Sequence, residues 1–205
     1  MKVSKLTNIT SNKLIVTEGQ DDENLLFAVM KHLGLDEIQV INCEGNSDLT
    51  DKIRTIAATH GFRENVRSLG IVRDAELNSE GAFQSVCNAL SNSGLGVPDE
   101  PLKSCTTMPR TTVLIWPHKQ EAGKLEDICL QSIYEFPEMS CIDDFFECLK
   151  AKDIPEPNDI SKAKVKAFLA SRQESVPHLG IAASKGYFPL DNAAFDDVKT
   201  FLRML

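Results

Sequence analysis

Two groups of acidic side chains follow short apolar segments of this chain. Residues 14–16 and 69–72 are continuous apolar runs, which are typical of strands buried on both faces of a parallel sheet. Each run leads directly into carboxylates: Glu18 and Asp22 after the first, Asp74 and Glu76 after the second. Ligands of parallel sheets bind outside the carboxyl ends of the strands. We therefore expect these four acids to share one edge of a sheet.

Such a group of acids is suited to a hard metal ion. Neighbouring carboxylates repel one another and raise each other's pKa values, and a divalent cation relieves that repulsion. Mg²⁺ and Mn²⁺ prefer carboxylate oxygens, and the chain has no His-rich cluster that would favour zinc. Each acid taken alone is more typical of a turn or a helix cap. The two groups together favour a site for Mg²⁺ or Mn²⁺.

The elements that must position these acids alternate along the chain. Apolar patterns predict strands at residues 14–17, 38–42, 69–72 and 111–116, with helices after each of them, at about 25–33, 53–57, 83–90 and 125–133. Alternating strands and helices predict right-handed crossovers and an α/β fold with a central parallel sheet of about four strands. Further helices are predicted at 142–149, 161–173 and after Pro189. We expect an α/β core over residues 1–135 and a mainly helical C-terminal extension, residues 136–205, packed on it.

Composition sets bounds on the partners of the chain. Its 205 residues have a formal net charge of −8, which argues against a broad electrostatic grip on nucleic acid without excluding local contact. No apolar run reaches membrane-spanning length, and the polar first residues lack the apolar centre of a secretory signal. We therefore expect a cytoplasmic protein that does not enter a membrane.

The acidic turns EGQDD, residues 18–22, and RDAE, residues 73–76, resemble those of the Toprim domain. This metal-binding module occurs in topoisomerases, bacterial primases, small ribosomal-RNA maturases and the overcoming-lysogenization-defect nucleases. The resemblance covers residues 14–133, and the expected order of strands and helices agrees with it. The later segments GKLEDICL and SKGYFPLDNAAFDDVKTFL are similar to small standalone Toprim-like proteins of bacteria and phages. The resemblance implies a Toprim- or Rossmann-like arrangement of the sheet.

The resemblance also assigns roles to single residues. Glu18, which forms a turn with Gly19, would be the Toprim glutamate that acts as metal ligand or general acid/base, and Asp22 the acid that opens the next helix. Asp74 and Glu76 would be the Asp-x-Asp metal pair, with Glu in the second position of this chain. Gly45, after the second predicted strand, would be a loop glycine of the family. In a looser match, Glu126 would be the acid that helps to bind a second metal.

Three basic residues are further candidates for contact with a phosphate. Lys119 follows the fourth predicted strand, and Lys185 lies near the end of the chain. Both are also compatible with an ordinary solvated surface position. Arg73 could contact phosphate or pair with a neighbouring acid.

These patterns lead to two hypotheses of different classes. The first is a Mg²⁺- or Mn²⁺-dependent nuclease or related phosphodiester-transfer protein that acts on DNA or RNA, with Glu18 and Asp74 as catalytic residues. The alternative is a non-catalytic metal- or nucleotide-binding module that acts with a partner protein, such as an ATPase in phage defence. The sequence leaves the substrate, the partner and the oligomeric state open.

Overall fold

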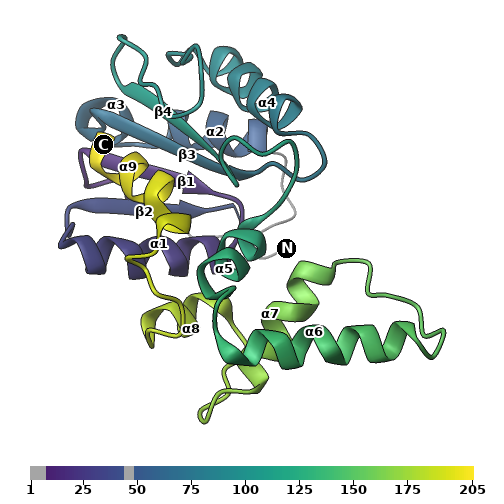
Figure 1. Ribbon diagram of the computed structural model, residues 1–205. Helices are drawn as coiled ribbons and strands as arrows, with labels where there is room; N and C mark the ends of the chain where they lie inside the picture. Colours follow the sequence, from purple (N-terminus) through teal and green to yellow (C-terminus); the bar gives the residue numbers. More distant parts are fainter. Residues whose placement is uncertain (1–7, 44–48) are drawn as a thin grey trace, which may run out of the picture.

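Four parallel strands form the centre of the molecule in the computed structural model, which describes residues 8–43 and 49–205 (Figure 1). They are β1 (Lys13–Thr17), β2 (Ile38–Asn42), β3 (Ser68–Asp74) and β4 (Arg110–Trp116), arranged in the order β2-β1-β3-β4. The register pairs Ile15 with Val40 on one side and with Gly70 on the other. The predicted α/β fold with a parallel sheet is confirmed. The strand order reverses between β1 and β3, which is where ligands of such sheets bind.

Helices cover both faces of the sheet. One face carries α1 (Gln20–Leu33), α5 (Leu125–Ile133) and α9 (Asp196–Met204), and the other carries α2 (Leu49–Ala58), α3 (Phe62–Asn65) and α4 (Ser79–Asn92) (Figure 1). Successive residues of β1 serve opposite layers, since Ile15 belongs to the first hydrophobic cluster and both Leu14 and Val16 to the second. The sheet is therefore buried on both sides, as its unbroken apolar strands predict.

Local sequence signals explain where several elements begin and end. Gly34 ends α1 in a left-handed conformation with φ 68°, where its N–H donates to the carbonyl groups of Lys31 and Met30. The sequence predicts this end correctly. Asn78 begins α4 by accepting a hydrogen bond from the N–H of Gly81 at 3.0 Å.

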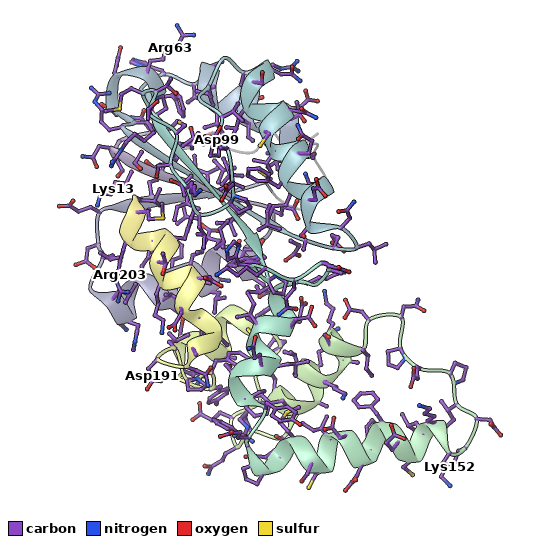
Figure 2. All side chains as sticks on the ribbon, turned by 45° about the horizontal axis from the view of Figure 1, so that its top comes forward. Lys13, Arg63, Asp99, Lys152, Asp191 and Arg203 are labelled. Atoms are coloured by element: carbon purple, nitrogen blue, oxygen red, sulfur yellow. The ribbon has the colours of Figure 1, made fainter. Side chains whose placement is uncertain are left out.

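The residues after α5 form an arm and a cover. The arm consists of α6 (Pro137–Lys150) and α7 (Ile160–Ala170), and it projects away from the sheet, with Lys152 at its far end (Figures 1 and 2). The cover consists of α8 (Leu179–Ser184), the short η1 (Ala193–Phe195) and α9. It returns to the sheet and places Phe188, Phe195 and Phe201 in the same hydrophobic cluster as Ile15 of β1. Within the described ranges, no helix combines the length and apolar character needed to cross a membrane.

Candidate metal centre

A cavity of about 640 Å³ opens at the carboxyl edge of the sheet, next to the switch point between β1 and β3. Acidic side chains from three separate segments line it, and these are Glu18, Asp21, Asp22, Asp74, Glu76 and Glu126. The structure thus brings together all five acids that the sequence predicts for a metal site. Asp21 is a sixth acid that the cavity adds to this set.

The first segment consists of the turn after β1 and the start of α1. Asp22 is buried, and its Oδ2 accepts hydrogen bonds from the N–H of Gly19 at 2.8 Å and from Oγ1 of Thr17 at 3.0 Å. These bonds tie the first turn of the helix back to the end of the strand. Glu18, between them, projects into the cavity. The Asp22 carboxylate therefore fixes the turn that presents Glu18 to the cavity.

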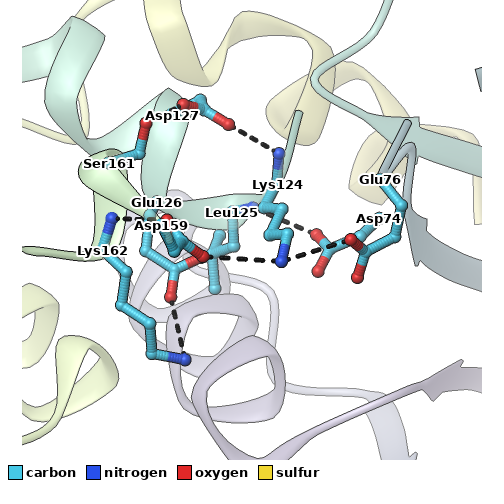
Figure 3. A network of polar contacts seen from close by, with 9 residues as sticks. All are labelled: Asp74, Glu76, Lys124, Leu125, Glu126, Asp127, Asp159, Ser161 and Lys162. Atoms are coloured by element: carbon cyan, nitrogen blue, oxygen red, sulfur yellow. Dashed lines mark hydrogen bonds and ion pairs between the residues drawn. The ribbon is translucent and has the colours of Figure 1, made fainter. Parts of the chain in front are cut away.

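Asp74 is the last residue of β3, and it joins the sheet to the start of α5. Its Oδ1 accepts a hydrogen bond from the N–H of Leu125 at 3.0 Å (Figure 3). Because Leu125 is the first residue of α5, this bond places the following residue, Glu126, at the same cavity. Asp74 and Glu126 are far apart in the sequence, and this hydrogen bond between the Asp74 side chain and the Leu125 backbone brings them together.

Glu76 reaches the cavity in a different way from the one that the sequence suggests. A spacing of two residues would place Asp74 and Glu76 on one face if the strand continued past both, but β3 ends at Asp74. Glu76 lies in the turn beyond it with φ 53°, a left-handed conformation that is uncommon for residues other than glycine. Its carboxylate is ion-paired with Nζ of Lys124 at 3.2 Å. Glu76 is thus held by a loop contact rather than by the geometry of the strand.

The carboxyl groups of the cavity influence one another electrostatically. Burial raises the pKa of Asp74 to about 8, and the negative charges of Asp22 and Glu18 add to this effect. Burial also raises the pKa of Glu18, although the nearby Arg73 guanidinium opposes the shift. The pKa of Asp22 is raised for the same main reason, despite its two stabilising hydrogen bonds. A bound cation would offset the crowded negative charges that contribute to these raised pKa values.

Three basic side chains line the same cavity and pair with its acids. Nε of Arg73 lies 3.1 Å from Glu18, Lys124 contacts Glu76, and Nζ of Lys162 lies 3.5 Å from Glu126. The alternative that pairs Arg73 with a neighbouring acid is therefore the one observed. The sequence does not show that Lys124 and Lys162 belong to this cavity, because the acids with which they pair lie far away along the chain.

Lys124 also links the cavity to the arm (Figure 3). Its Nζ lies 3.4 Å from Asp159, the N-cap residue of α7, whose side chain accepts a hydrogen bond from the N–H of Lys162 at 2.9 Å. Asp127 of α5 accepts a further bond from Ser161 at 2.5 Å. The start of α7 is thus fixed against the start of α5, and this contact brings Lys162 to the cavity.

The residues present fit a hard divalent cation in their chemistry. The acids of the cavity offer carboxylate oxygens, which such cations prefer as ligands. One of these oxygens, Oδ1 of Asp21, is buried without a hydrogen-bond partner. In their present orientations, however, no three His, Cys, Asp or Glu side chains of the described residues surround one common point. Glu18, Glu76 and Glu126 instead turn towards Arg73, Lys124 and Lys162. A cation bound here would compete with these ion pairs.

The remaining candidates from the sequence lie elsewhere. Lys185 is ion-paired with Glu174 and lines a separate cavity of about 480 Å³ beside Arg172 and Tyr187. Lys119 is exposed on the loop after β4, and the described residues that line the acidic cavity do not include it. Gly45 lies outside the described residues.

Fold and site together define a three-layer α/β protein with an acidic cavity at its switch point. The family described as "Protein of unknown function (DUF3226)" matches residues 12–205, and the chain belongs to this family. Comparison with curated proteins gave no match.

Among solved structures, the chain is similar to the C-terminal region of the Xanthomonas campestris pv. campestris OLD protein. The structure phased with platinum is 15% identical, covers 87% of this chain and 92% of its own, and has a TM-score of 0.40. The structure phased with mercury is 11% identical, covers 95% and 86%, and has a TM-score of 0.38.

Proposed function

We propose that this chain is a Mg²⁺- or Mn²⁺-dependent nuclease, or a related phosphodiester-transfer protein, with a Toprim-like core. The observation that carries the proposal is the meeting of Glu18, Asp22, Asp74 and Glu126 in one cavity at the switch point of the sheet. The resemblance of EGQDD and RDAE to the Toprim turns supports it. Acids placed in this way would hold the cation by Asp74, Asp22 and Glu18.

The bound cation would polarise a phosphoryl oxygen and lower the pKa of a water molecule. The side chains of the cavity would supply proton transfer and the orientation of the phosphate. Glu18 is half-buried, and its raised pKa suits a residue that takes up and returns a proton. Lys124 and Lys162 would orient the phosphate by balancing its negative charge, since both already face carboxylates at the same cavity.

A cleavage assay with matched variants tests this function. The purified protein is incubated with single- and double-stranded DNA and RNA in Mg²⁺ or Mn²⁺. We expect cleavage by the wild type and at least a hundredfold loss in Glu18→Gln and Asp74→Asn. Matched controls are Glu37→Gln and Asp99→Asn, since both acids are exposed and outside the cavity lining (Figure 2 labels Asp99). Cleavage that survives both cavity substitutions would contradict the proposal, as would no cleavage of any substrate.

The ion pairs of the cavity favour a second candidate, a non-catalytic metal- or nucleotide-binding module that acts with a partner protein. Three of its carboxylates are already neutralised by Arg73, Lys124 and Lys162. Such a module would bind Mn²⁺ or a nucleotide without cleaving any nucleic acid. Calorimetric titration separates the two candidates, because binding that is lost in Asp74→Asn but accompanied by no cleavage fits only the second.

A further inference from the structure

A leucine stands almost free of the protein beside the acidic cavity. Leu77 is 92% exposed and directly follows Glu76, which lines that cavity. Single apolar residues on a surface need no explanation in general. Leu77 differs from them in two respects, which are the rigidity of the turn that presents it and the poor match between its type and that turn.

The backbone around Leu77 is fixed on both sides. The N–H of Asn78 donates to the carbonyl of Ala75 at 3.0 Å, which closes a four-residue turn with Leu77 in its third position. Glu76 and Gly123 exchange two backbone hydrogen bonds, of 2.8 and 2.9 Å. A further bond of 2.8 Å joins the N–H of Ser79 to the carbonyl of Glu121. These bonds fix the backbone of the turn, and the leucine side chain extends from it into solvent.

The residue types at the tip of this turn oppose its local conformation. A positive φ at the second position of a turn, here 53° at Glu76, favours Gly, Asn or Asp. The polar residues typical of turns would also suit the third position better than leucine, which gains nothing from burial there. Departures from local rules are expected where a surface meets a ligand. Glu76 lies at the ligand-binding cavity in the proposed function. Leu77, the next residue, is a candidate for contact with the same ligand.

We propose that Leu77 packs against the bases of a nucleic-acid strand whose phosphate lies in the acidic cavity. This inference rests on the proposed function and specifies which part of the substrate the turn contacts. A phosphate held near Glu76 and Lys124 would leave its attached bases outside the cavity, and Leu77 is the exposed residue next to Glu76 in the chain. Apolar side chains in such positions insert between bases and partly unstack them. Because every base has an apolar face, the contact would tolerate different sequences.

Binding to labelled oligonucleotides tests the contact without requiring cleavage. Fluorescence anisotropy measures affinity for single- and double-stranded DNA and RNA in Ca²⁺, and a 2-aminopurine in the strand reports unstacking. We expect Leu77→Ala to bind about tenfold more weakly than the wild type and to lose the rise in 2-aminopurine fluorescence. Met108→Ala is the matched control. Met108 is 71% exposed and precedes the amino end of β4, whereas the acidic cavity lies at the carboxyl ends of the strands. It should bind like the wild type.

The outcomes separate this inference from the proposed function. Hydrolysis of bis(p-nitrophenyl) phosphate in Mn²⁺ reports the acidic cavity alone and should be equal in the wild type and Leu77→Ala. Equal DNA binding by the two proteins would overturn the role of Leu77 while leaving the proposed function intact. Loss of self-association in Leu77→Ala with unchanged DNA binding would assign the leucine to a protein contact, and this also overturns the inference. A wild type that binds neither DNA nor RNA and does not hydrolyse the diester would refute both.

Discussion

Replacement of Asp74 by asparagine is expected to stabilise the metal-free protein at neutral pH. The folded protein keeps a proton on Asp74 up to a pKa of about 8, whereas the ordinary value is 3.8. The unfolded chain loses this proton at the lower pH, so the stability contributed by the group is complete in acid and falls as the pH rises from about 4 to 8. Asparagine has no proton to lose, and its side-chain oxygen can still accept the hydrogen bond from Leu125.

The magnitude follows from the separation of the two pKa values. About three pKa units lie between the ordinary value and pH 7, and each unit corresponds to about 1.4 kcal/mol. The wild type should therefore lose up to about 4 kcal/mol of unfolding free energy between pH 4 and pH 7 through Asp74. Asp74→Asn avoids this loss. The advantage of the variant over the wild type should be small at pH 4 and large at pH 7.

Urea unfolding followed by circular dichroism measures this difference. Wild type, Asp74→Asn and the exposed control Asp99→Asn are compared at pH 4, 5.5, 7 and 8 in buffer that contains a chelator. We expect the midpoint of Asp74→Asn to rise relative to the wild type with increasing pH and that of Asp99→Asn to follow the wild type. A difference between Asp74→Asn and the wild type that does not change with pH would refute the assigned cause, which is the burial of Asp74 among other acids.

Three further results are expected from the same structure. Mg²⁺ at about 100 times its dissociation constant should add about 2.7 kcal/mol to the unfolding free energy of the wild type, and no gain in thermal midpoint, or an equal gain in Asp74→Asn, would argue against a metal site. Gly180→Ala should destabilise by about 1–3 kcal/mol in urea unfolding, because the added Cβ would lie 2.0 Å from Cβ of Asn24 on α1, and an unchanged midpoint would mean that α8 is free to move. Asp159→Ala should cost about 1 kcal/mol through loss of the N-cap of α7, measured in the same way, and a neutral result would show that the bond from Ser161 to Asp127 holds the helix start without it.

The sheet could be predicted from the sequence because its strands are short apolar runs between clear turn signals. The helices that pack on it repeat apolar residues at helical spacing over several turns, and the end of α1 carries a glycine. The helices α3 and α8 could not be predicted in this way, since four and six residues are too few to show a period. Their place is decided by packing, as at Gly180 against Asn24.

The acidic cavity could be predicted in part. The edge of the sheet at which Glu18, Asp22 and Asp74 meet follows from the parallel topology. The position of Glu76 could not be derived, because the two-residue period of a strand does not reveal that the strand stops at Asp74. The ion pair between Lys124 and Asp159 depends on how α7 packs on α5, and no local pattern contains this information.

The way in which residues 179–205 close the sheet has a consequence for synthesis on the ribosome. Ile15 of β1 emerges early, yet Phe201 of α9 shares its hydrophobic cluster and fills the space beside Gly70 of β3. A nascent chain that has released every acid of the cavity therefore still lacks the helix that covers β1 and β3 on this face. We expect a protein truncated by a premature stop codon before Asp196 to be cleared by cellular proteases, although all its acidic turns are intact.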